Sequence, residues 1–131
     1  SEMCIRDRFL EGMNEPNNLP NWLSNEDLEF FTKEFKKSGM FGPLNRYRCM
    51  DLDWKDLFNL SFNKIKKPSC FITGSLDPVN FFIPGVNLFD SIDKNYDDLR
   101  VKEQLNDIGH WTQQEAPEQV NKILLDFLEK I

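Results

Sequence analysis

The chain has 131 residues, a hydrophobic content of 40%, a formal charge of −6 and a pI near 4.8. This length suffices for one globular domain but is small for a complete α/β enzyme. The acidic balance argues against a nucleic-acid partner, because such binding depends on clustered Lys and Arg that neutralise phosphates. No apolar run approaches the roughly 20 residues that a membrane helix requires.

The cysteine and histidine content indicates the redox environment of the chain and limits the metal sites that it can form. Cys4, Cys49 and Cys70 are odd in number and widely spaced, and only one histidine accompanies them. A disulfide framework and a zinc site are therefore not expected, and no cofactor is expected either. A reducing, cytoplasmic location fits this pattern best.

The first half of the chain predicts two helices. Ser24 followed by Asp27 is close to a capping box, and apolar residues at helical spacing predict an amphipathic helix that continues to about Lys37. After Gly42-Pro43, a second helix is predicted to run toward Leu52 or beyond.

The second half alternates predicted strands and helices. Residues 69–73 are a short apolar run, typical of a parallel strand covered on both faces, and residues 99–104 alternate like a strand nearer an edge. A helix or turn is predicted near residues 84–92, and a last helix begins at Pro117. Its apolar residues have the spacing of a core-facing stripe: Val120, Ile123, Leu124, Phe127, Leu128 and Ile131. This βαβα order predicts an α/β fold with a parallel sheet, and two strands bury such a sheet only as part of a larger fold.

His110 is the residue best suited to acid–base chemistry, since histidine alone titrates near neutral pH. It follows the second predicted strand after Gly109, whose backbone freedom suits a turn, and Asp77 ends the first strand. The carboxyl ends of neighbouring parallel strands meet at one edge, so Asp77 is expected to orient the imidazole. Taken singly, His110 would be a surface residue and Asp77 a turn former; together, in this order, they favour a site. Asp107 is expected to serve a turn.

Three segments resemble one known family. Residues 68–77 and 109–121 closely resemble the C-terminal part of soluble epoxide hydrolases of the α/β-hydrolase fold, and residues 35–48 resemble the lid helices of the same family. The resemblance implies the C-terminal part of an α/β-hydrolase fold. Its partial helical cap (lid) would span residues 19–64, and the last two parallel strands with their helices would span residues 65–131.

The resemblance implies a two-step hydrolysis of a small apolar epoxide by water to a vicinal diol. In this family an aspartate on a strand-to-helix elbow forms an alkyl-enzyme ester, which an activated water then cleaves. The resemblance assigns the general base to His110, its orienting acid to Asp77 and the hydrogen bond to the epoxide oxygen to Tyr47. From its spacing alone, Tyr47 would be a packed aromatic of a lid helix.

The chain departs from the family pattern in several places. Arg46 stands where the family usually has Trp, and the sequence contains no Gly-x-Asp-x-Gly elbow, no His-Gly-rich loop and no second lid tyrosine. The nucleophile is thus absent, and a C-terminal fragment that is inactive alone is expected. Residues 1–18 are expected to be unstructured, and residues 1–8 resemble a translated sequencing-adapter remnant.

Two other functions stay open. A haloalkane or haloacetate dehalogenase would share the Asp nucleophile and the His base, although Tyr47 favours the epoxide. A non-catalytic binding protein of the same fold would have lost the chemistry, and Arg46 is the one hint of this.

Overall fold

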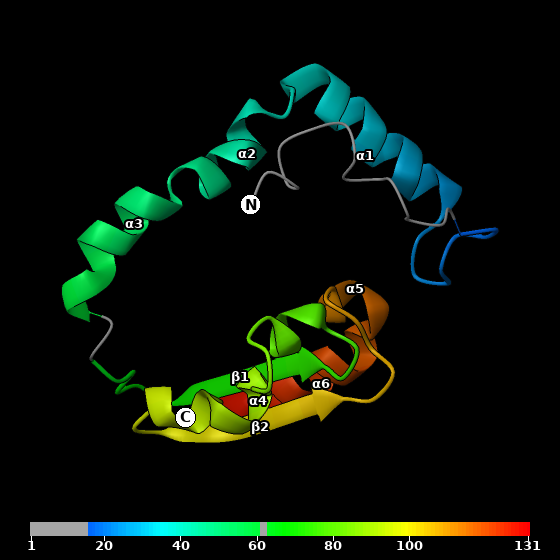
Figure 1. The fold of residues 1–131 in the computed structure, drawn as a ribbon. Coiled ribbons are helices and arrows are strands. Elements are labelled where there is room, and N and C mark those ends of the chain that lie inside the picture. Colours follow the sequence, from blue (N-terminus) through cyan, green and yellow to red (C-terminus); the bar gives the residue numbers. More distant parts are fainter. Residues whose placement is uncertain (1–15, 61–62) are drawn as a thin grey trace.

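A computed structural model describes residues 16–60 and 63–131 of the chain (Figure 1). The expectation of a sequencing remnant at residues 1–8, like that of an unstructured stretch up to residue 15, lies outside the described residues. So does Cys4. Within the described parts, no helix combines the length and the apolar character needed to cross a membrane.

Three helices form an arched row in the first half of the chain: α1 (Asn25–Ser38), α2 (Phe41–Arg48) and α3 (Met50–Leu57). A 3₁₀ turn at Phe58–Leu60 follows α3. The prediction of one helix after Gly42-Pro43 was wrong, because Cys49 interrupts it with φ −90° and ψ 1°. These angles lie in the bridge region, outside the α-helical range, so the helix axis changes direction there.

Helix α1 begins and ends where the sequence predicts. The Ser24 side chain accepts the Asp27 backbone N–H, and the Asp27 carboxylate in turn accepts the Ser24 backbone N–H, which completes a capping box. Hydrogen bonds from the Ser24 hydroxyl and backbone N–H lower the pKa of Asp27. The stabilisation by this ionised carboxylate is therefore complete above its ordinary pKa and is lost as the pH falls through the lowered value. Gly39, with φ 71°, ends the helix.

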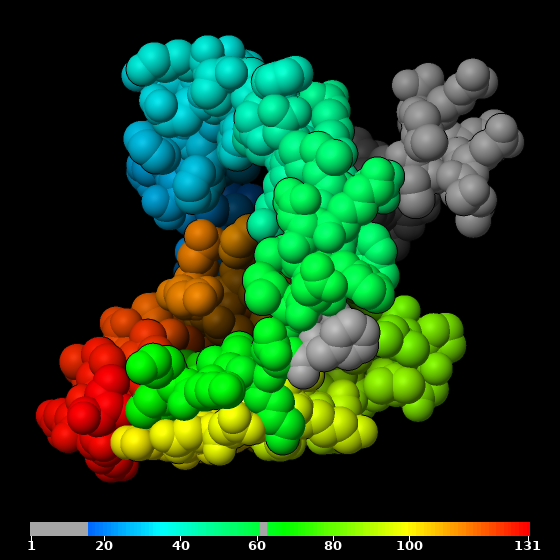
Figure 2. Space-filling view, turned by 90° about the vertical axis from the view of Figure 1, so that its left-hand side faces the viewer, coloured from blue at the N-terminus to red at the C-terminus, as the bar shows by residue number. Residues whose placement is uncertain are grey.

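The helical row buries none of its described side chains. The apolar stripe predicted for α1 forms on one helix face, but Leu28, Phe31 and Phe35 remain 43%, 41% and 45% exposed. Figure 1 shows the row separated from the layer that carries the strands, and Figure 2 shows it as the upper part of the molecule, coloured blue to green. The predicted helix is therefore confirmed, whereas its apolar face lacks a covering layer among the described residues.

A two-stranded parallel sheet organises the second half. Strands β1 (Ser69–Gly74) and β2 (Leu99–Leu105) pair in parallel, with Cys70 opposite Val101 and Gly74 opposite Leu105. The predicted strands and their parallel pairing are confirmed. Strand β1 has elements packed on both faces, as expected, although only its last two residues are fully buried and the first four are partly buried.

Different elements pack on the two faces of this sheet. On one face, α6 (Pro117–Leu128) contributes Val120 to a small core with Leu105 and Ala116, against which Ile72 packs. On the other, Phe71 contacts Phe89 of the short helix α4 (Leu88–Ser91), with ring centroids 6.3 Å apart. Successive side chains of a strand point to opposite faces, which explains how neighbouring residues 71 and 72 serve both layers.

Short helical turns provide the crossover between the strands. The helix or turn expected near residues 84–92 consists of α4 between two 3₁₀ turns, Pro78–Phe81 and Ile92–Asn95. Lys102 of β2 anchors this crossover, since its ammonium group pairs with Asp93 and lies 4.7 Å from the Phe89 ring centroid.

The C-terminal helix is only partly buried. Val120 and Phe127 are buried and Ile123 packs against the core, but Leu124, Leu128 and Ile131 are 38%, 56% and 63% exposed. The expectation that the whole stripe faces the core was therefore wrong. Two strands are too narrow to cover it. The short helix α5 (Thr112–Glu115), which the sequence analysis did not predict, precedes α6 and adjoins the end of β1.

Candidate active site

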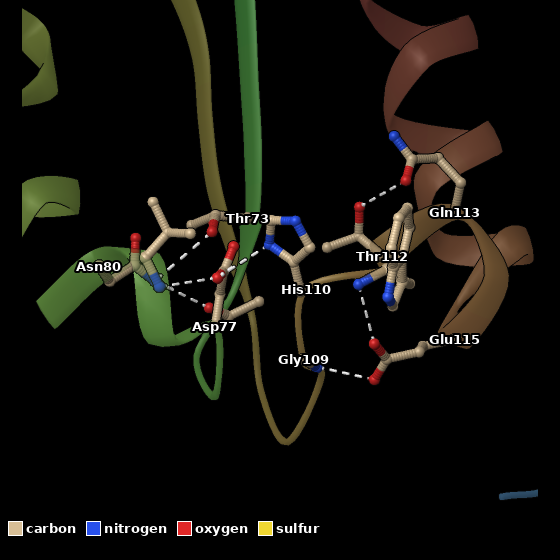
Figure 3. Close-up of polar contacts among 11 residues, drawn as sticks. Thr73, Asp77, Asn80, Gly109, His110, Thr112, Gln113 and Glu115 are labelled. Atoms are coloured by element: carbon tan, nitrogen blue, oxygen red, sulfur yellow. Dashed lines mark hydrogen bonds and ion pairs between the residues drawn. The ribbon is translucent and has the colours of Figure 1, made fainter. Parts of the chain in front are cut away.

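Asp77 and His110 meet at the carboxyl-terminal edge of the sheet. Asp77 follows β1 and His110 follows β2, and their parallel pairing brings both loops to the same edge. His110 Nδ1 lies 3.0 Å from Asp77 Oδ1, which is a hydrogen-bond distance (Figure 3). The structure thus brings together these two predicted residues.

Burial and hydrogen bonding fix the Asp77 carboxyl group. Asp77 is 8% exposed, and its Oδ1 also accepts the Val79 backbone N–H at 2.9 Å. This contact caps the 3₁₀ turn that begins at Pro78. The backbone of the loop therefore orients the carboxylate so that it faces His110 Nδ1 and can accept its N–H.

Asn80 stabilises the same loop and was missed by the sequence analysis. It is 4% exposed, and its amide Nδ2 donates to the Gly74 carbonyl at 3.0 Å and, more weakly, to Thr73 Oγ1 at 3.4 Å. The signal that could have revealed it is an amide inside the otherwise apolar run at residues 79–83. A buried amide in such a run requires polar partners, and here they are the end of β1.

The two loops lie against each other through backbone contacts. A Cβ at Gly74 would lie 2.0 Å from the Ile108 carbonyl oxygen, so only glycine permits this approach. The Leu76 N–H donates to the same Ile108 oxygen at 2.9 Å, and Asp107, with φ 59°, donates its N–H to Ser75 Oγ at 2.9 Å. Asp107 is the turn residue that was expected. These contacts set the distance between the Asp77 and His110 backbones.

Glu115 holds the segment around His110 and was also missed. Its two carboxylate oxygens accept the backbone N–H groups of Gly109 and Trp111, at 2.7 and 2.9 Å (Figure 3). Among the described residues, positive φ values of glycine occur at Gly39 and Gly85 and not at Gly109. Gly109 was expected to give the backbone freedom to turn; its φ is not positive, and its hydrogen atom leaves space for Glu115.

The geometry specifies the imidazole tautomer. A carboxylate partner at Nδ1 requires the proton to be on Nδ1, which leaves the lone pair on Nε2. In Figure 3 the second ring nitrogen lies on the side of the ring away from Asp77. The His110 side chain is 51% exposed, and its ring makes an edge contact with Trp111 at 5.2 Å. A neutral imidazole held in this way can accept a proton from water.

Tyr47, the third predicted site residue, lies apart from this pair. It belongs to α2 in the helical row and is 70% exposed. In the described parts of the chain, no hydrogen bond links Tyr47 to Asp77 or to His110. In the same parts of the chain, no group of three or more His, Cys, Asp or Glu side chains is placed to hold a metal ion.

A parallel strand pair with a hydrogen-bonded carboxylate and imidazole in its terminal loops is an arrangement typical of the α/β-hydrolase fold. No protein-family model matches the chain. It is 38% identical over 128 residues to Epoxide hydrolase B of Mycobacterium tuberculosis, covering 96% of this chain and 35% of that protein. It is 34% identical to Epoxide hydrolase 1 of Siraitia grosvenorii, covering 88% of this chain and 37% of that protein.

Solved structures give the same result. A Vigna radiata epoxide hydrolase mutant matches with a TM-score of 0.81 at 33% identity, covering 91% of this chain and 38% of that one. Epoxide hydrolase A of Mycobacterium thermoresistibile matches with a TM-score of 0.76 at 36% identity, covering 88% and 35%. The chain is thus similar to epoxide hydrolases over about nine tenths of its length, and its fold matches a C-terminal part of the α/β-hydrolase fold. It spans about a third of the length of the curated relatives named above, consistent with a C-terminal part of such a protein.

Proposed function

We propose that this chain carries the water-activating half of an epoxide hydrolase, with His110 as general base and Asp77 as its orienting acid. The observation that supports this most directly is the 3.0 Å contact between His110 Nδ1 and the buried Asp77 carboxyl group at the sheet edge. The relatives reported above are named epoxide hydrolases, which favours an epoxide over the alkyl halide of a dehalogenase. The substrates are a small apolar epoxide and water.

The proposed reaction has two steps. An aspartate outside this sequence attacks an epoxide carbon, the ring C–O bond breaks, and an alkyl-enzyme ester forms. His110 Nε2 then takes a proton from water, whose oxygen adds to the ester carbonyl carbon. The alkyl oxygen leaves with the proton of the imidazolium as the second hydroxyl of the diol. The aspartic acid that is released loses its proton, which balances the proton taken up by the epoxide oxygen when the ring opened. Asp77 holds the reactive tautomer and stabilises the imidazolium while it exists.

The same proposal divides the chain into a partial cap at residues 19–64 and a C-terminal part of the core at residues 65–131. The separation of the helical row from the sheet layer in Figure 1 supports this division. The free thiols of Cys49 and Cys70 support a cytoplasmic location.

The role of Asp77 is best tested in a chimaera, in which this chain replaces the aligned region of Mycobacterium tuberculosis Epoxide hydrolase B. Asp77→Asn is expected to lower kcat about 10⁴-fold, because an amide at this position also stabilises the wrong imidazole tautomer. Single-turnover kinetics should place the loss in ester breakdown and leave ester formation nearly unchanged. Asp90→Asn, at an exposed position of α4, is the matched control. An Asp77→Asn chimaera with the kcat of the parent would contradict the assignment.

Tyr47 is proposed to donate a hydrogen bond to the epoxide oxygen, whose negative charge increases as the ring opens. Tyr47→Phe in the chimaera is expected to slow ester formation by about 10²- to 10³-fold, as for the loss of one oxyanion donor. Rapid-quench measurement of the ester separates this step from its hydrolysis. Tyr96→Phe removes the other phenol of the chain and is expected to leave both steps unchanged. Equal effects of the two substitutions would contradict the role of Tyr47.

A further inference from the structure

We infer that Glu115 is a positioning residue, which holds the peptide groups on both sides of His110 and thereby fixes the imidazole against Asp77. This inference rests on the proposed function, since it concerns how the proposed base is held. Glu115 itself has no assigned place in the two-step reaction.

The contact is a two-point clamp. Glu115 Oε2 accepts the Gly109 N–H at 2.7 Å, and Oε1 accepts the Trp111 N–H at 2.9 Å. The two donors flank His110 in the sequence, so one carboxylate restrains the backbone before and after it (Figure 3). Hydrogen bonds to an ionised carboxylate are shorter and stronger than those between neutral groups. Glu115 is itself half-buried at the end of α5, where the helix fixes its backbone.

His110 needs such a restraint because its side chain has few contacts of its own. The ring is half-exposed, and among the described residues its polar and aromatic contacts are the hydrogen bond to Asp77 and the edge of Trp111. Asp77, by contrast, is buried and held by its own loop. A movement of the His110 backbone would therefore break the hydrogen bond from the histidine side. Glu115 restricts that movement.

Gly109 supplies an independent sign that the contact matters. A Cβ at this position would lie 3.0 Å from Glu115 Oε1 and 3.2 Å from Oε2, closer than side chains normally approach. Because the φ of Gly109 lies outside the left-handed region, an alanine there would meet no backbone strain. The substitution Gly109→Ala thus displaces the Glu115 carboxylate without removing it.

The test uses the full 131-residue chain, labelled with ¹³C and ¹⁵N. Glu115→Gln keeps the shape of the side chain but leaves one oxygen acceptor for two N–H donors. Glu118→Gln is the matched control, because Glu118 is exposed on α6 and has no side-chain hydrogen bond among the described residues. The chain contains one histidine, so every imidazole signal belongs to His110.

In mildly alkaline buffer, NMR of the neutral imidazole reports its tautomer, and amide hydrogen exchange reports the clamp. In the parent we expect a proton on Nδ1. In Glu115→Gln and in Gly109→Ala we expect the Nε2-protonated tautomer to appear, together with at least about tenfold faster exchange at Gly109 and Trp111. The double variant should be no worse than the stronger single one, since both act on one contact. Glu118→Gln should match the parent.

The contrary outcomes are distinct. If Glu115→Gln accelerates exchange in α5 but leaves the tautomer of His110 unchanged, Glu115 only caps that helix and the inference is wrong. If the parent imidazole already shows the tautomer mixture of free histidine, the hydrogen bond to Asp77 is absent, and the proposed function fails together with the inference.

Discussion

Replacement of His110 by glutamine in the chimaera is expected to abolish epoxide turnover while leaving ester formation intact. The expected loss is about 10⁴- to 10⁶-fold, the range found when one member of such a catalytic unit is removed. The first step needs only a carboxylate nucleophile and a donor to the epoxide oxygen. The second step needs a base, and glutamine has none that titrates near neutral pH.

The measurement is mass spectrometry of the intact chimaera after exposure to a styrene-type epoxide. We expect a mass increase equal to that of the epoxide, stable in His110→Gln and transient in the parent. Gln113→Ala, at an exposed position of α5, serves as a control for changes near the loop and should show the transient behaviour. A His110→Gln protein that has lost turnover and carries no adduct would show that His110 acts before the ester forms, contrary to the assigned role.

The 131-residue chain by itself is expected not to hydrolyse epoxides. Its sequence contains no nucleophile elbow, and without an alkyl-enzyme ester the Asp77–His110 pair has no intermediate to cleave. An imidazole that activates water without a covalent intermediate provides only a small part of the rate acceleration. The rate of epoxide hydrolysis by the chain should therefore be about 10⁴- to 10⁶-fold lower than that of the chimaera.

The comparison requires the purified chain and the chimaera at equal concentration, assayed for diol by chromatography with the same epoxide. Circular dichroism of the chain checks that its helices are formed. Turnover by the chain that disappears in His110→Gln would mean that this sequence contains its own nucleophile, and the two-step scheme would then be wrong. An inactive chimaera beside active Epoxide hydrolase B would contradict the family role.

The site was largely predictable from the sequence, and the elements that hold it were not. Asp77 and His110 were found because each follows a predicted strand, and parallel pairing brings such positions to one edge. Asn80 and Glu115 were missed because their importance lies in hydrogen bonds to backbone groups of neighbouring loop residues, and no sequence motif marks such contacts. Gly109 was singled out for its backbone freedom, whereas its close approach to Glu115 was not foreseen.

The helical predictions failed where packing, and not the local sequence, decides where a helix breaks and which of its residues are buried. Cysteine is not a helix-breaking residue type, yet Cys49 separates α2 from α3. The stripe of α6 has the right spacing, but only part of it meets the two strands present. Periodicity defines an apolar face, and whether that face is buried depends on which layers lie against it.

The sequence by itself determined the order of strands and helices, the capping of α1, the two residues proposed as base and orienting acid, and the resemblance to epoxide hydrolases. These features depend on residue type and on spacing along the chain. Only the tertiary structure decided the 3.0 Å contact that selects the Nδ1 tautomer, the Glu115 clamp around His110 and the exposed position of Tyr47 on α2. They depend on distances between segments that the chain brings together only on folding, when β1 and β2 pair and α5 turns back on the loop.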